Sequence, residues 1–166
     1  MGRSRATTSI LNVFRTPDHE RRDTSLVSRA EPFSASDFPV GATAKIIDLA
    51  GLFVGELPDS LIEELKPRAR LAVDAQGLLR RAEADGTMRF ADWAEKKRYL
   101  PMLDYFKTDA AEAKILTGRD DREEAARILA SWGAKEVMVT HNTEVLVLVE
   151  GRIHRAPFTL SNLSGR

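Results

Sequence analysis

The sequence predicts an α/β fold in which helices flank a mostly parallel β-sheet. The main observation is the order of segments between residues 105 and 142, which read as a strand, a short helix, a longer helix and a strand. Short apolar segments also alternate with helical ones earlier in the chain, between residues 44 and 103. A strand, a helical crossover and a second strand form a right-handed unit of a parallel sheet, and ligands bind beyond the carboxyl ends of such strands. We therefore expect a site at these ends.

The N-terminal part is predicted to be a small β element. Residues 7–14 (TTSILNVF) and 25–29 (SLVSR) have strand-like patterns. They are joined by a charged connection that is longer than the roughly two to five residues favoured by hairpins. A link rich in proline and serine follows. We therefore divide the chain into a β element with its linker, residues 1–40, and an α/β core, residues 41–166.

The first half of the core alternates between strands and helices. Its predicted elements are a strand at residues 44–49, a helix that begins at Pro58, a strand at 71–73, a polar stretch at 78–90 with a turn at Asp85-Gly86, and a helix at 93–103. In the first helix, Leu61, Ile62 and Leu65 fall on one face, which indicates an amphipathic helix.

The second half of the core contains clear helix signals. A strand at residues 105–107 stops at Thr108-Asp109, and Glu112 stands three positions after Asp109, as in a capping box. Gly118 and Gly133 are predicted to end the two helices in a left-handed conformation. A buried strand at 135–140 follows, and residues 145–149 and 152–156 form a terminal hairpin.

Composition excludes several classes of protein. The 166 residues carry 25 basic and 25 acidic side chains and no cysteine, so the formal net charge is zero. Balanced charge argues against broad binding to nucleic acid or to anionic membranes. No apolar run has the length of a membrane span, and no signal-peptide core follows the N-terminal arginines. We therefore expect a cytoplasmic protein without disulfides or thiolate metal sites.

Many ordered segments resemble the ribokinase-like PfkB carbohydrate kinases. The resemblance rests first on KTDAAEAxxLTG at residues 107–118 and on EAARILxxWGAKEVxVT at 124–140. Shorter matches are AxPFxxxD, LFxGExP, VDAQGxxR and DWxxK, and the final SNLSGR resembles the approach to a GRTGRGD signature. Together they span roughly residues 6–166. The resemblance implies a Rossmann-like sheet with a β lid, and ATP- and Mg²⁺-dependent phosphorylation of a sugar or sugar alcohol.

The resemblance also assigns roles to individual residues. Those expected to contact the nucleotide are Lys107, Asp109, Glu112, Thr140, Asn142 and Gly165. Glu112 is expected to act on Mg²⁺, and the lid residues Asn12 and Arg15 on the sugar. Alternative interpretations remain open: Asp109 and Glu112 as a helix cap worth about 1 kcal/mol, Thr140 and Asn142 as a turn, and the first hairpin as an ordinary exposed one. Asp74 at a strand end is either a cleft residue or a turn residue.

The sequence departs from the family pattern in ways that affect the expected activity. Asp109 replaces the asparagine of the family's NxxE motif, and VTHNTEV replaces VTLGxxG. Family segments for the Gly-Gly sugar-binding strands and for the catalytic aspartate have no counterpart. We therefore expect a central kinase fragment that is inactive alone and self-associates through an exposed sheet edge. The alternatives are a non-catalytic remnant or interaction module, and a different nucleotide-binding α/β protein.

Overall fold

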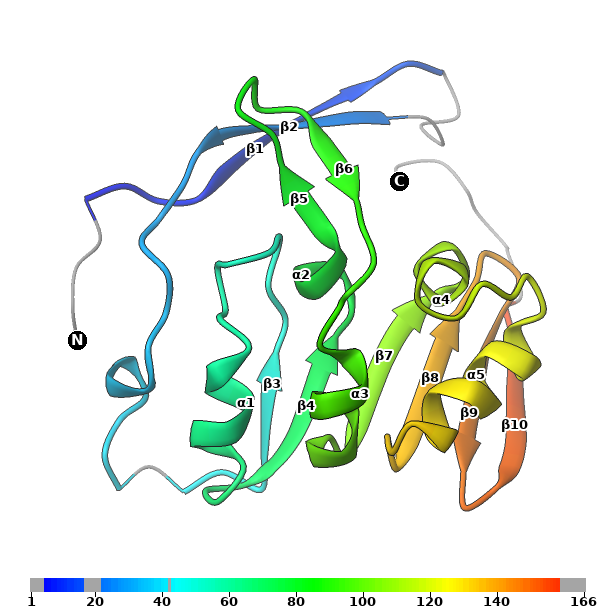
Figure 1. Cartoon of the computed structure of the whole chain (residues 1–166). Coiled ribbons are helices and arrows are strands. Elements are labelled where there is room, and N and C mark those ends of the chain that lie inside the picture. Colours follow the sequence, from blue (N-terminus) through cyan, green and yellow to red (C-terminus); the bar gives the residue numbers. More distant parts are fainter. Residues whose placement is uncertain (1–4, 17–21, 42, 159–166) are drawn as a thin grey trace.

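The computed structural model describes residues 5–16, 22–41 and 43–158. Its centre is a six-stranded sheet in the order β10-β9-β8-β7-β4-β3 (Figure 1). The strands are β3 (Ile46–Leu49), β4 (Arg70–Asp74), β7 (Tyr105–Asp109), β8 (Glu136–Thr140), β9 (Glu144–Val149) and β10 (Arg152–Pro157). The first four run parallel, whereas β9 and β10 are each antiparallel to their neighbours. The predicted α/β fold with a mostly parallel sheet is confirmed.

Helices lie on one face of this sheet (Figure 1). The helices are α1 (Ser60–Leu65), α2 (Gln76–Leu79), α3 (Lys96–Tyr99), α4 (Ala110–Thr117) and α5 (Arg122–Ser131). Phe106, Val137 and Val139 are at most 1% exposed, and α5 adds Ala125 and Leu129, both fully buried. Burial of this face supplies the main driving force for folding.

The opposite face of the sheet, here called the open face, carries no helix in the described part of the chain (Figure 1). Ile46 and Met138 lie on it and are 45% and 39% exposed. Since successive side chains of a strand point to opposite faces, β8 alternates between buried and exposed positions. The prediction of a buried strand at 135–140 is therefore correct for one of its two faces and wrong for the other.

Two short hairpins form a second layer, which we call the lid. They are β1 (Ser9–Phe14) with β2 (Arg22–Ser28), and β5 (Arg80–Ala82) with β6 (Met88–Phe90). The first hairpin confirms the prediction, whereas the second was foreseen only as a polar stretch with a turn. The Leu26 N–H donates to Gly86 O at 2.8 Å and joins the two hairpins. Gly86 has φ +84°, and a Cβ there would lie 2.9 Å from Leu26 O, so this junction requires glycine.

The base of the lid is fixed to the core by the buried carboxylate of Glu56. Its Oε1 accepts a hydrogen bond from Thr8 Oγ1 at 2.9 Å, and its Oε2 accepts one from the Leu52 N–H at 2.7 Å. The Ala30 N–H donates to Thr8 Oγ1 at 3.2 Å. Both ends of the first hairpin are therefore tied to the loop after β3. Figure 1 shows the lid above the carboxyl ends of β4 and β7. The proposed division at residue 40 stays a prediction.

One predicted helix is shorter in the structure. The helix expected at residues 93–103 consists of α3 and a 3₁₀ turn, Leu100–Met102. Pro101 lacks an N–H and cannot continue an α-helical ladder, which explains the change of helix type. The predicted helix ends are confirmed, since Gly118 and Gly133 have φ values of +74° and +115°. In the part of the chain that the structure describes, no helix is long and apolar enough to cross a membrane.

The amino ends of the strands, away from the lid, meet at Asp104, which is 5% exposed. Its carboxylate accepts hydrogen bonds from Lys66 Nζ at 2.7 Å, Lys135 Nζ at 2.6 Å and the Leu71 N–H at 3.0 Å. Burial raises the pKa of Asp104, but these hydrogen bonds outweigh it and hold the pKa well below its usual range. One carboxylate therefore joins the end of α1 to the starts of β4 and β8.

Candidate functional site

Two cavities meet at Asp109, where β7 ends and α4 begins. The first, the lid cavity, has a volume of about 680 Å³ and lies between the lid and the core. Its lining includes Arg15, Gln76, Arg80, Phe90, Asp109 and Glu112. The second, the strand-end cavity, has a volume of about 470 Å³. Its lining is Asp109, Ala110, Ala111, Thr140, His141 and Asn142. Both cavities therefore lie at the carboxyl ends of the strands, where the sequence predicts a site.

Asp109 and Glu112 form a complete capping box. The Glu112 N–H donates to Asp109 Oδ1 at 2.7 Å, and the Asp109 N–H donates to Glu112 Oε2 at 2.9 Å. Glu112 is 4% exposed. Its burial raises the pKa of Glu112, the charges of Asp109 and Asp74 act in the same direction, and the hydrogen bond from the Asp109 N–H opposes them. The predicted capping box is confirmed, since both of its hydrogen bonds are present. Asp109 and Glu112 also line the lid cavity.

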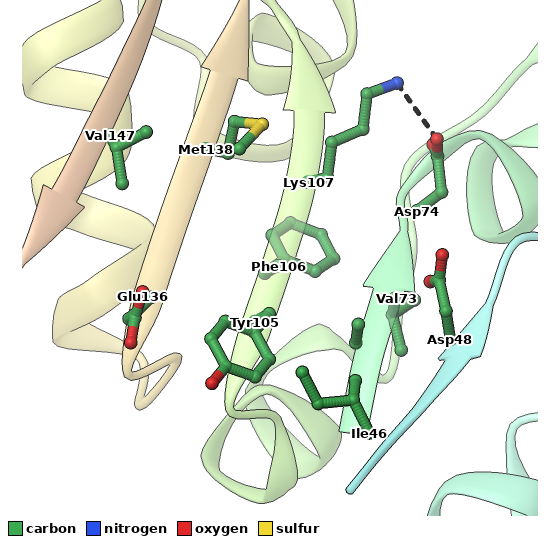
Figure 2. Close-up of a pocket in the computed structure, with 11 residues that line it drawn as sticks. Ile46, Asp48, Val73, Asp74, Tyr105, Phe106, Lys107, Glu136, Met138 and Val147 are labelled. Atoms are coloured by element: carbon green, nitrogen blue, oxygen red, sulfur yellow. Dashed lines mark hydrogen bonds and ion pairs between the residues drawn. The ribbon is translucent and has the colours of Figure 1, made fainter. Parts of the chain in front are cut away.

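Lys107 lies apart from these two cavities. It projects from β7 on the open face, where its Nζ donates to Asp74 Oδ2 at 2.9 Å (Figure 2). Burial lowers the pKa of Lys107, but the hydrogen bond and charge of Asp74 outweigh burial and raise it overall. Asp74 Oδ1 also accepts the N–H of Gln76, the first residue of α2, at 3.1 Å, so Asp74 is both a turn residue and an ion-pair partner. A nucleotide contact by Lys107 stays a prediction.

Thr140 and Asn142 are placed together in the strand-end cavity, as expected. Thr140 Oγ1 donates to Thr108 O at 3.4 Å and so lies across from β7. The His141 N–H donates to Glu144 O at 3.0 Å, and His141 Nδ1 is 2.9 Å from Thr143 Oγ1. These bonds form the turn into β9, so the turn interpretation holds while the same residues line a cavity. Their binding of a nucleotide stays a prediction.

The structure separates the two lid residues that were assigned to the sugar. Arg15 lines the lid cavity and pairs with Asp23 at 2.6 Å. Asn12 Oδ1 accepts a hydrogen bond from Thr24 Oγ1 at 2.7 Å, and Thr24 rather than Asn12 is a lining residue. Gly165 lies outside the described residues.

Comparison with solved structures identifies the family. A pyrophosphate-dependent kinase in the ribokinase family, in complex with sulfate, is 38% identical and superposes with a TM-score of 0.88, covering 98% of this chain and 57% of that one. A pyrophosphate-dependent kinase of the same family, complexed with a pyrophosphate analog and myo-inositol, is 37% identical with a TM-score of 0.87, covering 98% and 56%. This chain belongs to the ribokinase family.

A fructokinase from Vibrio cholerae O395 shares the fold, with 16% identity and a TM-score of 0.65. The match covers 91% of this chain and 50% of the fructokinase chain. No protein-family model matches the sequence, and no curated protein matches it. This ribokinase-family chain spans just over half of the length of the two pyrophosphate-dependent kinases.

The two carboxylates of the capping box are the candidates for holding a magnesium ion in this ribokinase-family chain. The box uses one oxygen from each carboxylate, Asp109 Oδ1 and Glu112 Oε2. Within the described residues, no group of three or more His, Cys, Asp or Glu side chains is arranged to hold a metal. Mg²⁺ bound to phosphates keeps several waters and typically uses only one or two carboxylates. The residues present therefore fit a phosphate-bound Mg²⁺ and do not fit an all-protein metal cage.

Sequence reasoning assigned no binding role to several residues that line the lid cavity, among them Gln76 and Arg80. Both belong to the VDAQGxxR segment that supports the family resemblance, where Gln76 was considered only as part of a strand end facing the cleft. They are four positions apart and bracket the single turn of α2, which brings their side chains to one side. Arg80 Nη2 donates to Gln76 Oε1 at 2.7 Å. The i,i+4 spacing of an arginine and an amide next to a strand end was the available signal.

Proposed function

We propose that this chain provides the acceptor cavity and part of the donor site of a kinase that phosphorylates a polyol. The observation that carries the proposal is the meeting of the two cavities at Asp109. An acceptor under the lid and a phosphate donor at the strand ends would face each other there. In the transfer, an acceptor hydroxyl oxygen bonds to the phosphorus, the bond to the donor's leaving oxygen breaks, and the hydroxyl proton passes to a base or to water. We assign that proton to no residue of the described part.

The chain's own residues would act by binding and orienting the reactants. Hydroxyl groups both donate and accept hydrogen bonds, so the carboxylates of the lid cavity suit a polyol. In the strand-end cavity, Thr140 and Asn142 would hold donor phosphates beside the start of α4. Asp109 and Glu112 would hold Mg²⁺, which supplies charge neutralisation of the phosphate oxygens. Positioning and electrostatic stabilisation account for most of the catalysis of phosphoryl transfer.

Pyrophosphate is the donor that we favour, with ATP as the alternative. The two kinases that are 37–38% identical are pyrophosphate-dependent, and one was complexed with myo-inositol. In addition, Asn142 stands where the resembled nucleotide-binding segment contains glycine, and it lines the strand-end cavity. Its side chain takes up space beside the strand ends, which supports a donor smaller than a nucleotide. A cytoplasmic location is part of the same proposal.

Nuclear magnetic resonance titrations of the ¹⁵N-labelled chain test this function. We expect myo-inositol to shift amide signals of the lid cavity, such as Thr24 and Thr87. Magnesium pyrophosphate should shift Ala110, Ala111 and His141 instead, and at lower concentration than Mg–ATP does. Sorbitol and sodium sulfate serve as controls for non-specific effects. Shifts by both ligands at the same residues, or at none of these, would contradict the proposal of two adjoining sites.

We also propose that the chain self-associates through the apolar part of the sheet that is not covered. Ile46 lies on the edge strand β3 and Met138 on the open face, both exposed. Exposed apolar sheet surface favours pairing with another chain. The mass measured by light scattering should rise with concentration, and replacing both residues with lysine should suppress this rise. A mass that stays monomeric at every concentration would refute the proposal.

A further inference from the structure

His141 is the one residue, among the described residues that line the strand-end cavity, whose side chain can carry a positive charge. Asp109 lines the same cavity and is acidic, and the other lining residues are alanine, threonine and asparagine. Lys107 projects instead on the open face, where it pairs with Asp74 (Figure 2). Phosphate groups are bound most strongly by charge-assisted hydrogen bonds. His141 is therefore the side chain to consider for direct contact with a donor phosphate.

The imidazole ring of His141 is oriented by a neighbour in its own turn. Its Nδ1 lies 2.9 Å from Thr143 Oγ1, and within the described residues its Nε2 makes no hydrogen bond. The Thr143 hydroxyl can donate to Nδ1 of a neutral ring or accept from Nδ1 of a protonated ring. Both states leave an N–H on Nε2, which can donate to a phosphate oxygen.

The backbone of this turn is fixed on both sides of His141. Thr140, directly before it, ends β8, and Glu144 begins β9. The His141 N–H donates to Glu144 O at 3.0 Å, and the Phe158 N–H donates to Thr143 O at 2.8 Å. The turn is therefore a tight connection between two strands of the central sheet, and it gives the imidazole ring a defined starting position.

The side chain of Glu144 anchors the same turn to the rest of the core. Its Oε1 accepts a hydrogen bond from Arg155 Nη1 at 2.6 Å and pairs with Arg122 Nη2 at 3.0 Å. Arg122 starts α5, whereas Arg155 lies on β10 and also donates to Glu123 Oε2 at 3.0 Å. The Glu144 side chain is only 17% exposed. These ion pairs hold the turn between α5 and β10, so His141 stands on a rigid support.

The charges around the cavity are compatible with a phosphate bound at His141. Asp109 would hold Mg²⁺, which neutralises part of the charge of the phosphate oxygens. The carboxylate of Glu144 is already balanced by its two arginine partners, and Thr143 is uncharged. The remaining phosphate oxygens would accept hydrogen bonds from the start of α4 and from His141. Binding would then combine a metal ion, backbone N–H groups and one imidazole N–H.

We propose that His141 donates a hydrogen bond from Nε2 to a phosphate oxygen of the donor, and that Thr143 positions the imidazole ring. This inference rests on the proposed function. It adds one residue that binds the donor and one positioning residue to the strand-end cavity, and it gives neither of them a role toward the acceptor.

Four variants of the full 166-residue chain test the two roles. His141→Leu removes the imidazole, Thr143→Val removes the hydroxyl but keeps a branched side chain of similar size, and Thr143→Ser keeps the hydroxyl. The control is His154→Leu, because His154 is exposed on β10 and does not line the strand-end cavity. Isothermal titration with magnesium pyrophosphate measures the affinity, and thermal melting shows whether each variant is folded.

The expected result is a loss of donor affinity that follows the imidazole. His141→Leu should weaken binding of magnesium pyrophosphate about tenfold, which corresponds to about 1.4 kcal/mol. Thr143→Val should weaken it by a smaller factor, whereas Thr143→Ser and His154→Leu should bind as the unaltered chain does.

Nuclear magnetic resonance of the ¹⁵N-labelled histidine rings gives a readout that does not depend on affinity. In the unaltered chain, the ring signals that are missing from His141→Leu should shift with magnesium pyrophosphate and not with myo-inositol. The same signals of the ligand-free chain should be altered by Thr143→Val and restored by Thr143→Ser. These spectra decide the matter if the melting curve shows that His141→Leu is unfolded.

Three outcomes would overturn the inference. Equal binding of magnesium pyrophosphate by His141→Leu and His154→Leu would make His141 an exposed turn residue and leave the proposed function standing. Weaker binding by Thr143→Val with unchanged ring signals would assign the contact to the hydroxyl instead of the imidazole. If the unaltered chain binds myo-inositol but no magnesium pyrophosphate, the donor half of the proposed function falls, and this inference falls with it.

Discussion

Replacing Asp104 with alanine is expected to lower the free energy of unfolding by about 2–4 kcal/mol. Hydrogen bonds to a charged group contribute about 1.5–3 kcal/mol each, and a buried N–H without a partner costs about 1–3 kcal/mol. The carboxylate accepts two lysine ammonium groups and the Leu71 N–H. Without it, that N–H lies unsatisfied at a fully buried residue. The two lysines are partly exposed and recover water, which keeps the loss below the sum of the bonds. Urea unfolding monitored by Trp93 and Trp132 fluorescence measures the change.

The matched control is Asp120→Ala, since Asp120 pairs with Lys114 at 2.6 Å but is 81% exposed. Exposed ion pairs contribute about 0–1 kcal/mol, so this variant should unfold almost like the original chain. An equal effect of both substitutions would show that the Asp104 cluster adds nothing beyond surface electrostatics.

The Asp104 cluster also makes stability depend on pH in one direction. The folded pKa of Asp104 is depressed, so its contribution is complete above the unfolded pKa of about 3.9 and is lost as the pH falls toward the folded pKa. The unaltered chain and Asp104→Ala should therefore differ fully at pH 6, and their difference should shrink below about pH 4. A difference that grows as the pH falls would contradict the assigned charge state.

Local signals explain why the sequence predicts most of the central unit. The Asp109–Glu112 capping box depends on residues three positions apart, and glycines end both helices of that unit. Apolar runs at residues 44–49 and 71–73 indicate core strands for the same reason, because a run of apolar residues is a property of the segment itself. Secondary structure that depends only on the residues of one segment can be predicted from that segment.

Features that depend on distant partners could not be predicted in this way. Asp104 is fixed by lysines that are 38 and 31 positions away. The strands β5 and β6 are only three residues long, too short for a reliable alternation pattern, and they attach to the first hairpin through the Leu26–Gly86 bond, which spans sixty positions of sequence numbering. Lys107 faces Asp74 because β4 and β7 pair in that register, and sequence spacing alone does not fix the register of parallel strands.

The same reasoning explains why the candidate site was only partly foreseen. Asp109, Thr140 and Asn142 were found because they lie at the ends of two predicted strands, and strand ends of parallel sheets meet at one edge. Glu112 was found because it stands three positions after Asp109, as in the NxxE motif of the resembled family. Arg80 was not found because the cavity that it lines exists only once the lid lies over the core. Which face a residue such as Met138 presents also depends on which helices cover the sheet.

Replacing Glu112 with glutamine is expected to weaken binding of magnesium pyrophosphate at least tenfold, which corresponds to about 1.4 kcal/mol, without lowering the melting temperature. Glutamine serves at this position of a capping box as glutamate does, so the cap on α4 remains. Burial raises the pKa of Glu112, which means that the folded chain holds the ionised carboxylate at a cost. The neutral amide removes that cost, and it also removes the negative charge that we expect to bind Mg²⁺. Isothermal titration and thermal melting measure the two effects.

The chain contains a matched control in Glu124, which occupies the same position after Asp121 at the start of α5. Glu124→Gln lies away from both cavities and should leave magnesium pyrophosphate binding unchanged. The free-energy cost of keeping Glu112 ionised in the folded chain is complete above its raised folded pKa. This cost disappears as the pH falls to the pKa of the unfolded chain, about 4.3. Any gain in melting temperature from Glu112→Gln should therefore be larger at pH 7 than at pH 4.5. If Glu112→Gln instead melts earlier and binds magnesium pyrophosphate as well as Glu124→Gln does, Glu112 is a helix cap and has no part in the donor site.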